Sequence, residues 1–331
     1  MQTFKAYRIH QDGKGVRAGF EDMSTDALTE GDVLVQVVYS GINYKDALAA
    51  TGKGRILRTF PLNGGIDMSG RVVESSSPRF QPGDAVLSCG MGMSETLDGG
   101  YAEYVRLPAD CLQALPDSIS LRDAMAIGTA GFTAAIAVQR MEDNGQVPEN
   151  GPIVVTGATG GVGSFAISLL SGLGYEIVAF TGKSEEHDYL RSLGATDFID
   201  RHSVEFGTRP LESARWGGAV DNVGGETLSW LTRTVKPWGS IASIGLAGGI
   251  DLNTTVMPLI LRGVSLLGIN SLELPDSMRQ HCWHRLGTDL KTKHMSLIAP
   301  RTIPFDDLPD AFDDFIAGKH TARTVVSVTP E

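Results

Sequence analysis

The chain has 331 residues, of which 42% are hydrophobic, and carries a formal net charge of -11 at pH 7. This length allows two domains, and the acidic balance argues against nucleic acid as a partner, because phosphate backbones require a basic face. The longest apolar stretches, such as 153–156 and 264–269, have the length of strands, so we expect no transmembrane helix. The N-terminus lacks the apolar segment of a signal peptide, which favours the cytoplasm.

The cysteine content excludes two kinds of site. Cys89, Cys111 and Cys282 are few and far apart, so they can build neither a disulfide framework nor a four-cysteine zinc site. We expect them to act as small apolar fillers.

The first part of the chain, up to about residue 121, alternates short strand-like runs with glycine, proline and aspartate. These runs are 4–10, 33–43, 65–75, 83–90 and 100–108. Such frequent turn residues predict a compact β-rich domain. An alanine-rich helix is expected from about Asp123. The segment after Ala299 predicts one amphipathic helix and a final strand that rejoins this first domain.

From Pro152 the pattern changes to alternating strands and helices. Strands are expected at 153–157, 175–182, 197–200, 218–225, 239–249 and 264–271, with helices at 162–174, 184–195 and 226–235. This succession predicts an α/β domain with a doubly wound parallel sheet. We therefore expect a β-rich domain at 1–121, completed by 299–331, and a nucleotide-binding domain at 122–298.

A glycine-rich turn follows the first strand of the second domain. The strand leads into Gly157, Gly160, Gly161 and Gly163, and a helix begins at once. Glycines allow the backbone to approach a pyrophosphate, whose charge the free N–H groups of the helix start can hold. The strand before the loop and the helix after it give the context that this motif requires, so we predict dinucleotide binding.

The end of the second strand in this domain indicates which dinucleotide is bound. NAD-binding folds place an acidic residue there for the ribose 2′-hydroxyl, whereas this chain has Thr181, Gly182 and Lys183. A hydroxyl, a close backbone approach and a cation suit a 2′-phosphate, and Arg201 can add a planar fork. NADPH is therefore expected rather than NADH. The alternative is that Lys183 and Arg201 are solvated surface charges.

Three further stretches carry a more specific resemblance. They are SGINYKDALAATGKG at 40–54, FPLNGGIDMSGRVV at 60–73 and VMPLILRGVSLLGINS at 256–271. With the glycine loop, they resemble the NADPH-dependent acrylyl-CoA reductases of the zinc-free quinone oxidoreductase branch of the medium-chain dehydrogenases/reductases. The resemblance implies a GroES-like β-rich domain, a Rossmann domain, and reduction of the conjugated C=C bond of acrylyl-CoA to propanoyl-CoA without a metal.

The resemblance also implies the site residues. Tyr44 lies beside the nicotinamide end, as a cofactor contact or, less favoured, as part of a proton relay. The pyrophosphate loop corresponds to Thr159, Gly160, Gly161 and Val162; the 2′-phosphate contacts correspond to Thr181, Gly182, Lys183 and Arg201; further cofactor contacts correspond to Leu246, Ile260, Ser271 and Arg323. The alternatives are core packing for Leu246 and Ile260, and an ion pair at the head of the last strand for Arg323.

The zinc ligands of related alcohol dehydrogenases are missing. Those enzymes carry a cysteine near the first helix and a Gly-His-Glu motif on the next strand, where this chain has Asn43 to Asp46 and Gly65-Ile66-Asp67. Isoleucine cannot bind a metal, so none is expected. A conjugated acceptor suits a site that lacks a Lewis acid. Asp46 could cap the helix, and Asp67 is expected to be a structural carboxylate.

Substrate and assembly are less constrained by the sequence. Lys53, Arg55 and Arg58 could attract the phosphates of a CoA thioester, or they could form a solvated loop. A quinone or general enone or enal reductase is the enzymatic alternative, and a non-catalytic NADPH-binding structural protein is the alternative of another class. The family resemblance also implies a homodimer that pairs the strand at 264–271, although the same pattern fits a buried internal strand.

Overall fold

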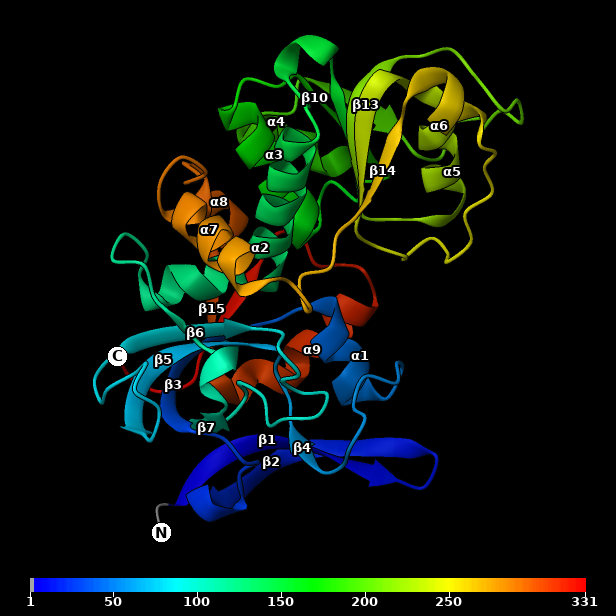
Figure 1. Cartoon of the computed structure of the whole chain (residues 1–331). Helices are drawn as coiled ribbons and strands as arrows, with labels where there is room; N and C mark the ends of the chain where they lie inside the picture. Colours follow the sequence, from blue (N-terminus) through cyan, green and yellow to red (C-terminus); the bar gives the residue numbers. More distant parts are fainter. Residues whose placement is uncertain (1–2) are drawn as a thin grey trace. The chain divides into compact units, whose positions relative to one another are not determined.

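The computed structural model describes residues 3–331 and divides the chain into two compact units (Figure 1). The first unit comprises Met1–Thr129 and Ala299–Glu331, and the second comprises Ala130–Ile298. The first boundary lies later than the expected position at 121. The reason is helix α2 (Leu121–Asp143), which begins in one unit, departs from helical geometry at Gly128 (φ 48°) and continues in the other.

The first unit is built on β-sheets. A mixed sheet has the order β15-β16-β3-β5-β6-β8, with β7 paired to β3; its strands are β3 (Val33–Gly41), β5 (Asp67–Ser75), β6 (Ala85–Cys89), β7 (Tyr104–Leu107), β8 (Gln113–Ala114), β15 (Arg301–Pro304) and β16 (Thr324–Ser327). A smaller sheet contains β1 (Thr3–Asp12), β2 (Gly15–Ser24) and β4 (Leu62–Asn63). Strand β16 pairs antiparallel with β3, so the end of the chain completes the first unit, as the sequence predicted.

Two helices pack together in this unit, α1 (Tyr44–Thr51) and α9 (Leu308–Ile316). Helix α9 presents Phe312 to a buried cluster that includes Tyr7, Met68 and Tyr101. Residues from both ends of the sequence therefore share one hydrophobic core, which holds the returning C-terminal segment in place.

The second unit is a parallel sheet with the strand order β11-β10-β9-β12-β13-β14. The strands are β9 (Ile153–Thr156), β10 (Ile177–Thr181), β11 (Asp197–Asp200), β12 (Trp216–Asp221), β13 (Val235–Ser243) and β14 (Ser265–Gly268); the helices are α3 (Gly161–Gly172), α4 (His187–Leu193), α5 (Gly225–Thr234), α6 (Met257–Arg262), α7 (Asp276–Gly287) and α8 (Met295–Ile298). The strand order reverses between β9 and β12, and ligands of such sheets bind at this switch point. Strand β14 lies at an edge, which excludes the alternative of a buried internal strand.

Helix α2 is long and apolar enough to cross a membrane by length and composition. The sequence analysis predicted an alanine-rich helix from about Asp123, but it considered only strand-sized apolar stretches as possible membrane spans. Within the described residues, 83% of its most apolar window is buried inside the protein. Its side chains pack in the core, with Phe132 stacked on Trp283 of α7, so its apolar composition has a structural explanation.

Candidate functional site

The glycine loop has the geometry of a phosphate cradle. Gly157 has a φ of 59°, in the left-handed region that favours glycine. A Cβ added to Gly163 would lie 2.8 Å from the Cα of Ala158, so a side chain there would collide with the loop. The N-cap of helix α3 is Gly160, which has no side chain to cap the helix, so the first N–H groups are left to bind an anion. The predicted residues Thr159 to Val162 form this loop, and the loop fits a dinucleotide pyrophosphate.

A buried network joins the ends of β9 and β12 beside the loop. Thr156 donates to the Asp221 carboxylate (2.7 Å) and accepts from the Asn222 N–H (2.9 Å), while Gly224 N–H donates to Asp221 (2.8 Å). Asp221 is fully buried, and burial raises the pKa of its carboxyl. The sequence analysis missed this network, which fixes the switch point where the two strands diverge.

The four residues predicted for the 2′-phosphate lie together at the ends of β10 and β11. Thr181 accepts a hydrogen bond from Arg201 N–H at its carbonyl (3.0 Å) and from Lys183 N–H at its hydroxyl (3.1 Å). A Cβ on Gly182 would lie 2.6 Å from Arg201 Nε and 2.5 Å from His202 Nε2. A side chain at position 182 would therefore collide with both, so glycine lets these side chains pack against the backbone, and His202 is a neighbour that the sequence analysis did not identify.

The remaining predicted contacts of the second unit are not core residues. Leu246 is 67% exposed and Ile260 is 72% exposed, so the core-packing alternative is wrong for both. Ser271 follows β14, and its carbonyl accepts a hydrogen bond from Arg279 (3.4 Å), whose guanidinium also holds the Leu272 carbonyl (3.0 Å). Arg279 is buried and lies over the Phe132 ring, so it fixes the loop that carries Ser271.

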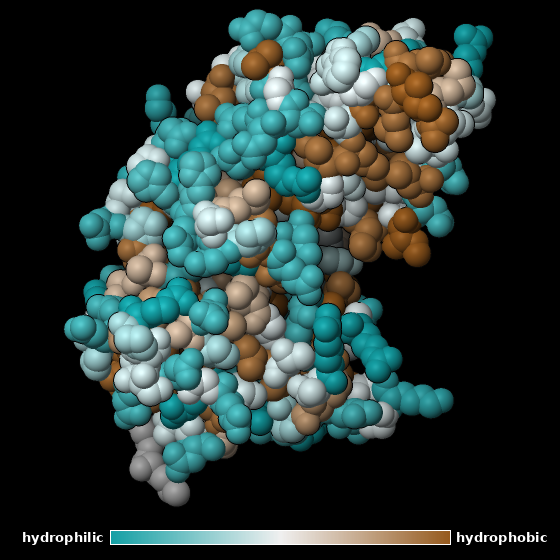
Figure 2. Space-filling view, viewed as in Figure 1, coloured by the Kyte–Doolittle hydropathy of each residue, from teal (hydrophilic) through white to brown (hydrophobic). Residues whose placement is uncertain are grey.

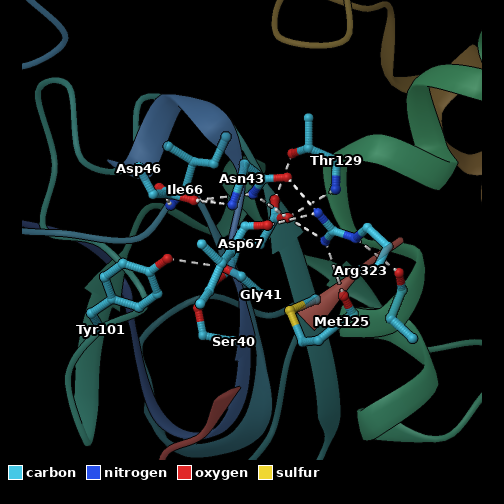
Figure 3. Close-up of polar contacts among 12 residues, drawn as sticks. Ser40, Gly41, Asn43, Asp46, Ile66, Asp67, Tyr101, Met125, Thr129 and Arg323 are labelled. Atoms are coloured by element: carbon cyan, nitrogen blue, oxygen red, sulfur yellow. Dashed lines mark hydrogen bonds and ion pairs between the residues drawn. The ribbon is translucent and has the colours of Figure 1, made fainter. Parts of the chain in front are cut away.

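Arg323 directly precedes β16 and lies in a buried polar network (Figure 3). Its side chain is 3% exposed and lies 3.6 Å from the Asp67 carboxylate. The guanidinium also donates hydrogen bonds to the carbonyls of Ile42, Met125 and Ala126 and to the side-chain oxygen of Asn43. Its burial and its protein partners support the ion-pair alternative, and the cofactor contact stays a prediction.

Asn43 bridges two buried carboxylates in the same network (Figure 3). Its side-chain nitrogen donates to Asp67 (2.9 Å) and to Asp46 (3.2 Å). Asp46 reaches back to the Asn43 N–H (2.8 Å), which confirms its expected role in capping α1, and it also accepts from the Ile66 N–H (2.9 Å). Thr129 donates to Asp67 through both its N–H and its hydroxyl, which confirms a structural role for that carboxylate.

The two carboxylates share a single buried cation, and this imbalance shows in the pKa of Asp46. Burial, and then the charge of Asp67, raise the pKa of Asp46 to about 7, although hydrogen bonds from Asn43 and Ile66 oppose the shift. Asp67 has the Arg323 guanidinium beside it, whereas the hydrogen-bond donors to Asp46 within residues 3–331 are neutral. Asp46 therefore takes up a proton near neutral pH.

Tyr44 is the first residue of α1 and is 51% exposed. It directly follows Asn43, so the buried network fixes the backbone from which its side chain projects. Of the basic residues after α1, Arg58 is ion-paired with Glu95 (3.6 Å), which also pairs with Lys45. Lys53 and Arg55 are exposed, and no partner is recorded for either within residues 3–331.

No group of three or more histidine, cysteine, aspartate or glutamate side chains within residues 3–331 is arranged to hold a metal ion. The residues at the positions of the zinc ligands make other contacts in this protein. Asn43 and Asp67 bind Arg323, and Ile66 is buried with its N–H on Asp46.

Comparisons with known proteins agree with this architecture. The chain matches the family models of the alcohol dehydrogenase GroES-like domain at residues 29–117 and the zinc-binding dehydrogenase domain at residues 161–286. Among curated relatives, the acrylyl-CoA reductase AcuI of Ruegeria pomeroyi is 44% identical over 98% of this chain and 99% of its own length.

Two solved structures carry nucleotides on the same fold. The yhdH oxidoreductase of Salmonella enterica in complex with NADP has a TM-score of 0.95 and 44% identity, covering 98% of this chain and 100% of its own. The yhfP protein of Bacillus subtilis, solved with NAD bound and provisionally named a quinone oxidoreductase, has a TM-score of 0.96 and 43% identity, covering 99% of this chain and 100% of its own.

The Asp46→Asn variant tests the buried carboxylate pair. The folded pKa of about 7 lies above the unfolded value of about 3.9, so the native state is favoured while Asp46 holds its proton and loses this stability as the pH rises through 7. Between pH 5.5 and 8.5 the wild-type free energy of unfolding should fall by about 2 kcal/mol more than that of the variant. Urea unfolding measures the difference, with exposed Asp117→Asn as control. Equal pH slopes for wild type and Asp46→Asn would contradict the assignment.

Proposed function

The chain belongs to the acrylyl-CoA reductase family, in the quinone oxidoreductase branch of the medium-chain dehydrogenases/reductases, and we propose that it reduces acrylyl-CoA to propanoyl-CoA with NADPH. The observation that carries this proposal is the near full-length identity with the Ruegeria reductase. Both NADPH and acyl-CoA thioesters are cellular metabolites, and we infer a cytoplasmic location.

The cofactor assignment is supported by two parts of the second unit. The uncapped start of α3 binds the pyrophosphate through backbone N–H groups, and Lys183 and Arg201 bind the 2′-phosphate through opposite charge. Thr181 accepts hydrogen bonds from the backbone N–H groups of both residues, which fixes their backbone at the ends of neighbouring strands. When bound, the nicotinamide supplies the hydride. The nucleotide in the Salmonella relative is NADP, in agreement with this assignment.

The protein's task during reduction is to orient the acceptor and stabilise the charge that develops on it. As the β carbon of the thioester gains hydride, negative charge moves to the carbonyl oxygen, and a proton then reaches the α carbon. Tyr44 is the residue we assign beside the nicotinamide, as a hydrogen-bonding contact. A phenol is a reluctant acid near neutral pH, so a contact role suits it better than that of an obligatory proton donor.

The phosphates of CoA require cationic side chains that are not already paired with a carboxylate. Lys53 and Arg55 meet this condition better than Arg58, because Glu95 already pairs with Arg58. We therefore assign Lys53 and Arg55 to the CoA phosphates and expect Arg58 to contribute less to CoA binding. The alternative activity, quinone or enone reduction, is favoured by the provisional name of the Bacillus relative and does not require these residues.

Steady-state NADPH oxidation with acrylyl-CoA, free acrylate and a simple quinone tests the substrate. The thioester should be strongly preferred. The Lys53→Ala and Arg55→Ala variants should each raise the KM for acrylyl-CoA by about fivefold and leave quinone reduction unchanged, because each removes one exposed phosphate contact. Exposed Lys14→Ala is the matched control. Turnover of quinone alone would reassign the enzyme, and absence of turnover with every acceptor would favour a structural role.

Removal of the 2′-phosphate cations tests the choice of cofactor. Arg201→Ala and Lys183→Ala should each weaken NADPH binding about 10- to 100-fold, because a charge-assisted hydrogen bond is lost, while NADH binding stays the same. Fluorescence titration of the reduced nucleotides measures both affinities, and Lys14→Ala serves as a surface control. Equal weakening of NADH and NADPH would show that these residues act on folding and not on the phosphate.

We infer that two copies of the chain pair through the edge strand β14. The edge offers unpaired backbone groups, and exposed apolar residues surround it (Figure 2, upper right). These residues are Leu246, Ile250, Leu252, Val256, Met257, Leu259, Ile260, Leu261 and Leu266. In a symmetric dimer, each copy would cover these residues of the other copy. Leu246 and Ile260 are then exposed in the single chain because the partner is needed to cover them.

The Leu261→Asp variant tests this assembly. Leu261 is 63% exposed in the single chain, and an aspartate there would bring two buried carboxylates into a symmetric interface. Light scattering should show a dimer for the wild type and a monomer for the variant, with Val147→Asp, at an exposed apolar position on another segment, remaining dimeric. A monomeric wild type would refute the dimer.

A further inference from the structure

We propose that a pocket in the second unit binds the phosphate group of a small phosphorylated metabolite. The pocket has a volume of about 340 Å³, and it is lined by residues of the segment 207–215 and by Thr234. None of the residues that we assign to the nucleotide or to the substrate lines this space. The inference therefore goes beyond the proposed function and does not depend on it.

The pocket lies at the amino ends of two parallel strands. Arg215 directly precedes β12 and Thr234 directly precedes β13, and the Arg215 N–H donates to the Thr234 carbonyl (2.8 Å). The glycine loop instead follows β9, which runs parallel to β12, so the loop lies at the opposite edge of the same sheet. An anion in the pocket is therefore a ligand separate from the dinucleotide.

Positive charge is in excess around the pocket. Arg209 and Arg215 line it, and neither guanidinium has a hydrogen-bond or ion-pair partner among residues 3–331. The lining carboxylate, Glu212, lies 3.1 Å from Arg233 Nε, and only 18% of the Glu212 side chain is exposed. Arg262 donates to the backbone carbonyls of Arg233 (2.7 Å) and Glu212. One carboxylate thus stands against four guanidiniums, in a chain with a formal net charge of -11. The excess positive charge attracts an anion.

Backbone contacts hold the wall of the pocket in place. The Glu212 N–H donates to the Arg233 carbonyl (3.1 Å), which joins the segment before β12 to the end of α5. A Cβ added to Gly207 would lie 2.7 Å from the Glu212 carboxyl group, so glycine lets this carboxylate pack against the backbone. Glu212 is therefore held beside Arg233, and the guanidiniums of Arg209 and Arg215 keep their N–H donors for a ligand.

The donors and the volume of the pocket indicate the class of ligand. Thr208 and Ser213 also line it, and neither hydroxyl has a hydrogen-bond partner among residues 3–331. A phosphate monoester suits two guanidiniums and two hydroxyls, because it carries nearly two negative charges and three acceptor oxygens. A carboxylate has one charge and two oxygens and would satisfy fewer of these donors. The volume is at the lower end for ligand sites, which favours a small ester over a dinucleotide.

Thermal unfolding of the full chain, measured while glycerol 3-phosphate is titrated at constant ionic strength, tests the inference. The wild-type midpoint should rise with the ester concentration, because the ligand binds the folded state. In Arg215→Gln and in Arg209→Gln, about tenfold more ester should be needed for the same rise, since each variant loses a charge-assisted hydrogen bond. Lys14→Gln, which removes an exposed cation of the first unit, is the matched control and should behave as wild type.

Two other anions, titrated in the same way, identify the ligand. Glycerol 3-phosphate should raise the wild-type midpoint more than inorganic phosphate does, and acetate should have little effect. Acetate as effective as the ester, or inorganic phosphate effective where the ester is not, would overturn the assigned class of ligand. Both arginine side chains are exposed, so the variants should unfold at the wild-type temperature when no anion is added.

Saturating NADPH separates this site from the nucleotide site. The titrations are repeated in its presence, so that the ester cannot act through the glycine loop, and the rise in the wild-type midpoint should persist. A rise that disappears with NADPH, or that is equal in wild type and both arginine variants, would overturn the pocket as a site, because phosphate esters would then act at the loop or on the protein surface in general. Failure to bind NADPH would overturn the cofactor assignment alone.

Discussion

The buried Arg323 guanidinium is the interaction on which the first unit depends. It joins the last strand of the chain to the start of α1, the start of β5 and the first part of α2. Such a cation is tolerated in the interior only because carbonyls, an amide and a carboxylate surround it. Gly128 is part of the same constraint, because its positive φ and missing side chain leave room for Arg323 and Asp67.

This polar network fixes the start of α1. Hydrogen bonds from Asn43, Ile66 and Thr129 to two carboxylates hold this region. The excess negative charge raises the pKa of Asp46 to about 7, so the network is sensitive to neutral pH in a way that a fully paired cluster would not be. The same network fixes the backbone of Tyr44, because Tyr44 directly follows Asn43.

Local patterns allowed much of the fold to be predicted from the sequence, and long-range pairing explains most of what could not. The glycine loop and the residues 181–183 depend on a few neighbouring residues, so their chemistry can be read directly. The burial of Arg323 depends on segments some 200 to 280 positions away in the chain, and no periodic pattern in the sequence indicates that these segments are in contact. Similarly, the exposure of Leu246 and Ile260 follows from which strand forms the sheet edge, which apolar composition alone does not reveal.

Two kinds of group have separate roles in the proposed nucleotide site. We propose that backbone N–H groups at the start of α3 hold the pyrophosphate that all these dinucleotides share, and that selection between them comes from side chains at the ends of β10 and β11. The relatives support this division, because structures with TM-scores of 0.95 and 0.96 to this chain carry NADP in one case and NAD in the other. Two relatives of one fold thus carry different nucleotides, which agrees with our proposal that residues around Gly182, and not the shared backbone, set the preference.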